Sequence, residues 1–291
     1  MLIRLREFLL NQLTAGPSNR VLNESTAGIS AYPPPSQPAD EGLRRLMNRL
    51  IGQFASADGS RVDYDRLRAS PLFQTDFMVM AAGLAHFDPA HLTELPQRMS
   101  FWINVYNVLV LHAVIDLGVK RSVSERWGGL TFFRQAAYRI GRQRLSLDDI
   151  EHGILRSNRG HPFLPGVQFA KDDPRLGWAL PHVDVRIHFA LNCASRSCPP
   201  IGVYRPEQLN RQLDLAAAHF VDQDVERAGE NDLRLSSIFR WYQSDFGGQQ
   251  GVLDFLLRYL PASDPRHGWI ESRRGSLRLT FRPYDWELNR L

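Results

Sequence analysis

Apolar residues recur every three or four positions over much of the chain, a spacing that is typical of amphipathic helices. The segment 43–54 has leucines and a phenylalanine at this spacing and predicts a helix. A second helix is predicted from Ser100 to about Leu117, where Gly118 ends it. This second segment is apolar nearly all round, so we expect it to lie inside the molecule.

The clearest strand prediction is the segment from Val185 to Cys193, in which apolar and polar residues alternate. On that interpretation, His188 and Asn192 project from one face and Cys193 projects from the other. Further predicted elements are helices over 147–156, 206–221 and 251–259 and strands over 233–236 and 276–281. Because helices dominate, the sequence predicts an α+β fold, a mostly helical single domain with a small β-sheet.

Changes in composition divide the chain into three parts. Residues 1–13 alternate arginines with leucines and other apolar residues and predict an amphipathic N-terminal helix. Residues 14–41 are rich in proline, glycine and serine, a composition that is typical of a linker. Residues 42–291 contain most of the periodic apolar pattern and are expected to form the domain. With 291 residues, 43% of them hydrophobic, the chain can bury a substantial core.

Charge and hydropathy narrow the classes of partner. The net charge is +4, from 35 Lys+Arg and 31 Asp+Glu, and the basic residues are scattered, so we expect no nucleic-acid partner. The longest apolar run, 105–115, is too short and too polar to span a bilayer. Membrane contact through 1–13 is an alternative, but docking of that helix on the protein's own core is commoner. The expected partner is a small-molecule or peptide ligand of unknown identity.

The two cysteines, Cys193 and Cys198, cannot form the disulfide framework of a small secreted protein. We therefore expect a reducing compartment and a cytoplasmic location. Strand alternation places Cys193 in the core and leaves Cys198 in a loop that two prolines stiffen. A dithiol switch is disfavoured, because the spacing is not Cys-x-x-Cys and one thiol is expected to be buried.

Reactive side chains are densest between residues 188 and 198. A thiol nucleophile needs a base to make the thiolate and a third group to orient that base. Cys198 as nucleophile, His188 as base and Asn192 as orienting amide form an allowed catalytic set, with Ser197 and Cys193 beside it. The structural alternative is that Cys198 caps a turn, His188 bonds a buried backbone group or carboxylate, and Asn192 closes the loop.

Two other segments place polar residues at positions that we expect to be buried. Asn104 and Asn107 lie on one side of the apolar helix, where an amide needs hydrogen-bond partners. They could orient a catalytic histidine, hold a substrate carbonyl or satisfy the backbone of a neighbouring loop. Glu151 shares a face with the apolar residues of the 147–156 helix, and His152 is beside it. This pair belongs either to a site or to a structural ion network. Ser146, three residues before Asp149, predicts a capping box.

The sequence predicts no metal site and no cofactor. His188, Cys193 and Cys198 are suitable ligand types, but their spacing follows no zinc pattern and strand alternation separates His188 from Cys193. The chain also lacks a glycine-rich phosphate loop, a nucleophile elbow and a kinase signature.

Several separate motifs follow one another in a characteristic order. They are VDY at 62–64, FWINVYN at 101–107, LSLDDIEH at 145–152, IHFALNC at 187–193, SCPP at 197–200, IFRWY with DF at 238–246, and YDWELN at 284–289. Together they resemble the domain of unknown function 547 family over about 42–289. Plant members of that family often carry a leucine-zipper segment, which implies partner binding. This chain departs from that pattern, because its residues 14–41 are rich in proline instead.

A helix followed by a histidine-bearing strand is also the layout of papain-like and transglutaminase-like thiol enzymes. In those folds the cysteine begins the helix, whereas Ser100 begins it here. Two functions remain open. One is a thiol-dependent hydrolase or acyl transferase that uses Cys198, His188 and either Asn104 or Asn192. The other is a non-catalytic protein-interaction module whose polar motifs hold the fold together.

Overall fold

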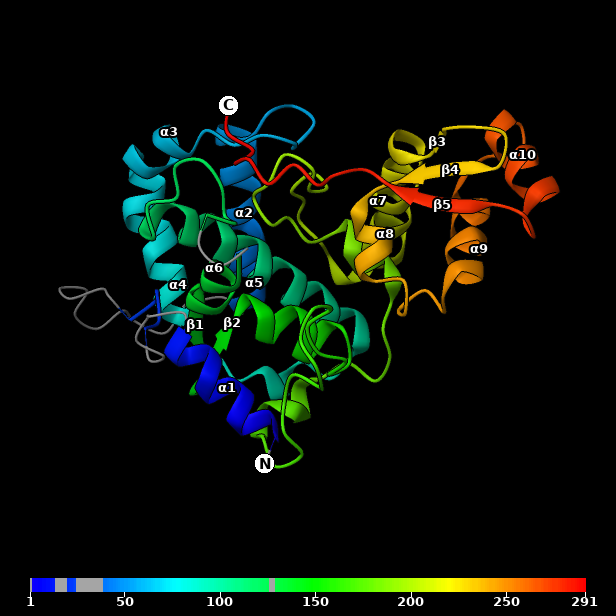
Figure 1. Ribbon diagram of the computed structural model, residues 1–291. Helices are drawn as coiled ribbons and strands as arrows, with labels where there is room; N and C mark the ends of the chain where they lie inside the picture. The colour runs from blue at the N-terminus through cyan, green and yellow to red at the C-terminus, as the bar shows by residue number, and fades with distance from the viewer. Residues whose placement is uncertain (1, 14–19, 25–38, 126–128) are drawn as a thin grey trace.

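The computed structural model describes residues 2–13, 20–24, 39–125 and 129–291. It has the predicted fold class, a mostly helical α+β arrangement with small sheets. Figure 1 shows a larger lobe built by the first two thirds of the chain and a smaller lobe that contains α7 to α10 and β3 to β5. The last residues return from the smaller lobe to the larger one, so the chain connects the lobes twice.

The helices and strands of the larger lobe are, in chain order, α1 (Leu2–Leu13), α2 (Ala39–Phe54), α3 (Tyr64–Ala69), η1 (Leu72–Phe77), α4 (Met78–Leu84), η2 (Pro89–His91), α5 (Leu95–Asp116), α6 (Leu130–Gln135), β1 (Ala137–Ile140), β2 (Gln143–Ser146), η4 (Asp149–Leu155), η5 (Pro174–Trp178) and η6 (Val185–Phe189). Those that follow are η7 (Pro206–Gln208), α7 (Leu209–Asp224), β3 (Glu226–Arg227), β4 (Asp232–Leu235), α8 (Ser237–Trp241), α9 (Gln249–Tyr259), α10 (Pro265–Arg273) and β5 (Arg278–Phe281).

Helix α5 is the central element of the larger lobe. It begins at Leu95, five residues before the predicted start, because Glu94 and Gln97 form a capping box there. Every residue from Met99 to Val114 is buried, as its apolar composition predicts. By length and composition alone α5 could cross a membrane, but 89% of its most apolar window is buried within the fold.

The hydrophobic core has two parts, one in each lobe. The larger part surrounds α5, and the smaller part lies between α7, α9 and β4. Element η6 reaches both, because Ile187 packs in the larger core and Phe189 packs in the smaller core. His188 therefore lies between the two cores, at the junction of the lobes.

The prediction of a strand over 185–193 is wrong. Residues 185–189 form the 3-10 helix η6, which begins where the Asp184 carboxylate accepts the N–H of Arg186. The backbone beyond it bonds to a side chain of α5 instead of a neighbouring strand. The Asn107 amide donates to the Ala190 carbonyl at 3.0 Å and accepts from the Asn192 N–H at 2.9 Å. The faces assigned by strand alternation are therefore wrong as well.

The sheets are small. Strands β1 and β2 form an antiparallel hairpin, and β4 pairs with β3 in antiparallel and with β5 in parallel orientation. Strands β4 and β5 confirm the two predicted strands near 233–236 and 276–281. After β5 the chain runs back along the larger lobe (Figure 1), where it forms bridges to Ser122, Ser195 and Val62. This return places residues 284–286 beside the cysteine loop.

The N-terminal segments pack against the larger lobe. In α1, Glu7 pairs with Arg134 at 2.8 Å and Leu10 is buried, whereas Phe8 is more than half exposed. Most of the predicted linker over 14–41 lies outside the described residues. Its described part, 20–24, buries two apolar side chains and the Asn23 amide, which bonds backbone groups of α4 and β1. This part thus buries more surface than its composition predicts.

Candidate functional site

A cavity of about 310 Å³ lies where the two lobes and the C-terminal segment meet. Its volume is at the lower end of the range found for small-molecule sites, which is about 300–1,000 Å³. Its described lining consists of Tyr106, Leu130, Phe133, Asp148, Glu151, His152, His161, Pro162, Phe163, Leu164, His188, Leu191, Cys193, Cys198, Pro199, Ile238, Trp241, Tyr242, Tyr284 and Trp286. Five of the nine residues predicted for the site are therefore in one cavity.

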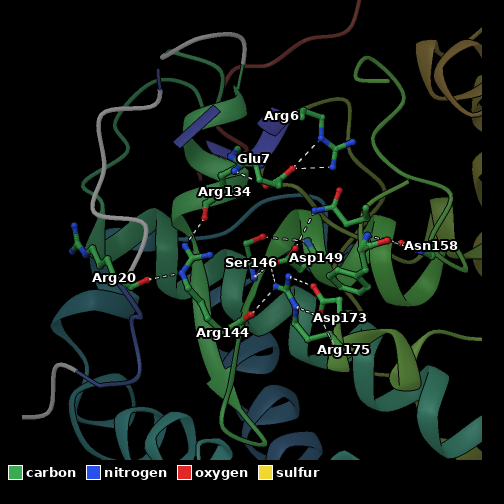
Figure 2. A network of polar contacts seen from close by, with 12 residues as sticks. Arg6, Glu7, Arg20, Arg134, Arg144, Ser146, Asp149, Asn158, Asp173 and Arg175 are labelled. Carbon is green, nitrogen blue, oxygen red and sulfur yellow. Dashed lines mark hydrogen bonds and ion pairs between the residues drawn. The ribbon is translucent and has the colours of Figure 1, made fainter. Parts of the chain in front are cut away.

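Element η4 and the residue before it, Asp148, supply the acidic side of the cavity. This element is a π-helix, a rare form that is frequent at functional sites. The predicted capping box is confirmed, because Ser146 and Asp149 each accept the other's backbone N–H, at 3.1 and 3.0 Å. Figure 2 shows Asp149 between Ser146 and Arg175, whose guanidinium donates to the carboxylate at 3.0 Å. Burial opposes ionisation of Asp149, but Arg175 and these hydrogen bonds hold its pKa below the ordinary value.

The tight packing of η4 fixes the side chains that it presents. A Cβ placed on Gly153 would lie 2.2 Å from the ring of Phe169, so only glycine fits there. Glu151 accepts hydrogen bonds from the hydroxyls of Tyr106, at 3.0 Å, and Tyr242, at 2.5 Å. Its partners are thus two tyrosines, one from each lobe.

His188 forms a buried pair with Asp245. Its Nε2 lies 3.0 Å from Asp245 Oδ2, and the two side chains are 1% and 0% exposed. Because a carboxylate only accepts, the proton of this bond belongs to Nε2. Arg156 donates to the same carboxylate at 2.6 Å, and the imidazole stacks on Tyr242 with ring centroids 3.9 Å apart. Nδ1 has no hydrogen-bond partner among the described residues, and the side chain lines the cavity.

The electrostatic environment keeps the His188 imidazole neutral and the Asp245 carboxylate ionised. Burial lowers the pKa of His188 below its ordinary value, although Asp245 partly offsets the effect. Burial alone would raise the pKa of Asp245, but the bonds from His188 and Arg156 hold it below the ordinary range. A neutral imidazole with a free Nδ1 can accept a proton at neutral pH.

The two cysteines form a disulfide, which corrects the predicted separation of a buried Cys193 from a free Cys198. Their Cα atoms are 6.1 Å apart, and both side chains line the cavity and are half-buried. The chain doubles back between them at Ala194, whose φ is +65°. The predicted separation of the two thiols was wrong because it relied on strand alternation, and this segment is a loop and not a strand.

Hydrogen bonds surround both sulfurs. Cys198 Sγ lies 2.8 Å from the Cys193 backbone nitrogen, which donates to it, and 3.3 Å from the Tyr284 hydroxyl. Cys193 Sγ lies 3.2 Å from Ser195 Oγ and 3.3 Å from the same tyrosine hydroxyl. Ser197 does not line the described cavity, and its Oγ accepts the backbone N–H of Asp285 at 2.9 Å. It therefore holds the C-terminal segment against the cysteine loop.

The amides of Asn104, Asn107 and Asn192 all bond to backbone groups. This is the structural role that the sequence left open for each of them as the alternative to a role in a site. Asn104 bonds both the N–H and the carbonyl of Tyr204, and Asn107 holds the segment after η6 as described above. Asn192 donates to the Pro199 carbonyl at 2.7 Å and accepts from the Ala194 N–H at 2.9 Å. These amides are not among the described lining residues, and the side chain that bonds His188 is Asp245 instead of Asn104 or Asn192.

Asp148, His152 and His161 lie close enough to suggest a metal site, with one ligand atom of each within 4.8 Å of the others. Their hydrogen bonds do not fit that role. Nδ1 of His152 accepts from the Arg156 guanidinium at 3.0 Å, and Nδ1 of His161 accepts the Phe163 N–H at 3.1 Å. Each neutral ring therefore carries its proton on Nε2, which then has no lone pair for a metal.

Sequence reasoning found His188, Glu151, His152 and the cysteines but missed Asp245 and the residues that complete the cavity. Asp245 is 57 residues from His188 in sequence, and Tyr284 is 86 residues from Cys198. The motifs at 238–246 and 284–289 contain both residues and were the only signal for them.

Comparisons with curated proteins and with solved structures give no significant match. Residues 89–221 match the model of a family described as "Protein of unknown function, DUF547". The matched region contains α5, η4, η6 and both cysteines, and so most of the cavity. It confirms the resemblance drawn from the motifs. Over residues 89–221, the chain is therefore similar to the DUF547 family.

Proposed function

We propose that the protein is a thiol-dependent hydrolase or acyl transferase, in which Cys198 is the nucleophile and His188 is the base, oriented by Asp245. The observation that carries this proposal is a single cavity lined by both sulfurs and by the imidazole of a buried His–Asp pair. This combination supplies the nucleophile, base and orienting group that thiol catalysis requires.

Of the two sulfurs, Cys198 is the better nucleophile. Its Sγ accepts a hydrogen bond from a backbone N–H, a donor that cannot reverse its role, and another from Tyr284. Hydrogen bonds to the charged form favour a thiolate. The contacts of Cys193 Sγ are to two hydroxyls, either of which can act as acceptor.

Reduction must precede the reaction. A dithiol reductant gives two electrons and two protons to the Cys193–Cys198 bond and is itself oxidised to a disulfide. The cytoplasmic location that we propose would keep the pair reduced.

In the first half-reaction, the Cys198 proton passes to His188 Nδ1 and the sulfur attacks the carbonyl carbon of the substrate. The bond to the leaving group then breaks, and His188 returns the proton to that group. In the second half-reaction, water or another nucleophile cleaves the thioester, and His188 accepts a proton from it and gives it to the sulfur.

The test uses an activated ester such as p-nitrophenyl acetate. The protein is reduced, freed of reductant without oxygen and mixed with the ester, and nitrophenol release and acylation of each cysteine are measured. We expect a burst and an acyl group on Cys198, and neither in the oxidised protein. Cys193→Ser is the informative variant, because it leaves Cys198 unable to form the bond and should be active without reduction.

The matched control is Cys198→Ser, which should be inactive. Asp245→Asn should lower the acylation rate by at least about 100-fold if Asp245 orients the base. Folded Cys193→Ser protein and folded, reduced wild type that are not acylated would refute the proposed thiol-dependent activity. The alternative function, a non-catalytic protein-interaction module, would then be favoured.

A further inference from the structure

Aromatic rings form one wall of the cavity. Trp241 stacks on Trp286 with ring centroids 5.5 Å apart, and Tyr284 contacts both, at 4.8 and 4.6 Å. Phe163 meets Trp241 edge-on at 5.8 Å. These rings come from three distant segments of the chain and all line the cavity. Aromatic faces attract cations, and clusters of them bind alkylammonium groups.

Asp148 lines the same cavity and has no hydrogen-bond partner among the described residues. It is 4% exposed, and its contact with His152 Nε2 spans 3.8 Å, which is too long for a hydrogen bond. A buried carboxylate without a partner is costly and uncommon. Its free oxygens therefore indicate a ligand that donates to them or carries a positive charge.

The described lining contains neither lysine nor arginine, although arginine is frequent in this chain. The arginines around η4 are paired with other carboxylates: Arg6 and Arg134 with Glu7, Arg156 with Asp245, and Arg175 with Asp149 and Asp173. No protein cation therefore occupies the space between Asp148 and the aromatic wall within the described part of the chain.

We propose that the cavity binds a small alkylammonium ion, with its charge near Asp148 and its alkyl groups against Trp241 and Trp286. The carboxylates of Asp148, the residue before η4, and Glu151 supply the negative charge, and the rings supply apolar contact and cation–π attraction. This site depends on the cavity alone, so it is tested on the oxidised protein, in which the proposed thiol reaction cannot occur.

The site has a characteristic pH dependence. Burial raises the pKa of Asp148 to about 8, and Asp149, Glu151 and Glu7 add to this effect while Arg134 opposes it. The neighbouring imidazoles stay neutral, because burial lowers the pKa of His161 to about 4 and that of His152 well below its ordinary value. Affinity for a permanently charged ligand should therefore rise as the pH passes through about 8.

The probe is choline, a quaternary ammonium ion, and the control ligand is 3,3-dimethyl-1-butanol, its uncharged analogue of the same shape. Binding is followed by tryptophan fluorescence and calorimetry at pH 6 and pH 9. At pH 9 we expect choline to bind at least about 10-fold more tightly than the alcohol. Between pH 9 and pH 6 the choline affinity should fall by a similar factor.

Two variants complete the design. Asp148→Asn should bind choline at pH 9 as weakly as the wild type does at pH 6, whereas Asp254→Asn, which changes an exposed carboxylate in α9, should bind like the wild type. Equal affinity for choline and the alcohol, or a pH-independent affinity for choline, would overturn the proposal. So would competitive displacement of choline by zinc in the wild type but not in His161→Ala, because that would identify a metal site.

Discussion

Replacing Asn107 with alanine tests how the segment after η6 is held. The Asn107 amide is fully buried and makes two hydrogen bonds to backbone, one with the Ala190 carbonyl and one with the Asn192 N–H. Alanine leaves both groups buried without a partner. Each such group costs about 1–3 kcal/mol, so we expect the free energy of unfolding to fall by about 2–6 kcal/mol.

The assay is urea unfolding followed by tryptophan fluorescence, together with hydrogen exchange at the Asn192 amide. The matched control is Asn48→Ala, the same substitution on the exposed face of α2, which should change stability by less than about 0.5 kcal/mol. A loss below about 1 kcal/mol for Asn107→Ala, with unchanged exchange at Asn192, would refute the reasoning that this amide replaces strand pairing.

Three further predictions concern the elements around the cavity. Gly153→Ala should destabilise the protein by about 1–3 kcal/mol, because the added Cβ would meet the ring of Phe169. The control Gly52→Ala, on the open face of α2, should stabilise the protein by up to about 1 kcal/mol. Urea unfolding measures both changes. Asp148 has a pKa of about 8 in the folded protein and about 3.9 when unfolded, so its contribution to stability should fall between pH 4 and pH 8, where the folded state still holds the proton and the unfolded state has lost it. Asp148→Asn should therefore be more stable than the wild type at pH 9 but not at pH 4, and an equal difference at both pH values would contradict this. Asp245→Ala leaves a buried arginine unpaired and should cost about 3–5 kcal/mol by the same assay, and a change below about 1 kcal/mol would show that the ion pair is not needed.

Local sequence patterns predicted the helices well, because helix formation depends mainly on residues that are close together in the sequence. The apolar character of α5 and the Ser146–Asp149 capping box depend on residues within a few positions of one another. The strand prediction over 185–193 failed because alternation there has another origin. Ile187 and Phe189 pack in two different cores, and the backbone partner is a side chain from α5.

The candidate site could be predicted only in part for the same reason. Reactive residue types marked His188 and the cysteines, but the group that orients His188 comes from the other lobe. No local pattern indicates that Asp245 would meet His188, or that the C-terminal segment would return to place Tyr284 on the sulfurs. The cysteine bond was missed because the wrong strand assigned the two thiols to different environments.

The central claim is that His188 and its surroundings activate Cys198, and the most direct measurement is the rate at which iodoacetamide alkylates each cysteine as a function of pH. The reduced protein is sampled over time, and the two modified positions are quantified separately by mass spectrometry, in the wild type and in His188→Asn. The account predicts a pKa for Cys198 at least one unit below about 8.5, the value of a free thiol, and a return toward that value in His188→Asn. A Cys198 profile that matches a free thiol in both proteins would contradict it.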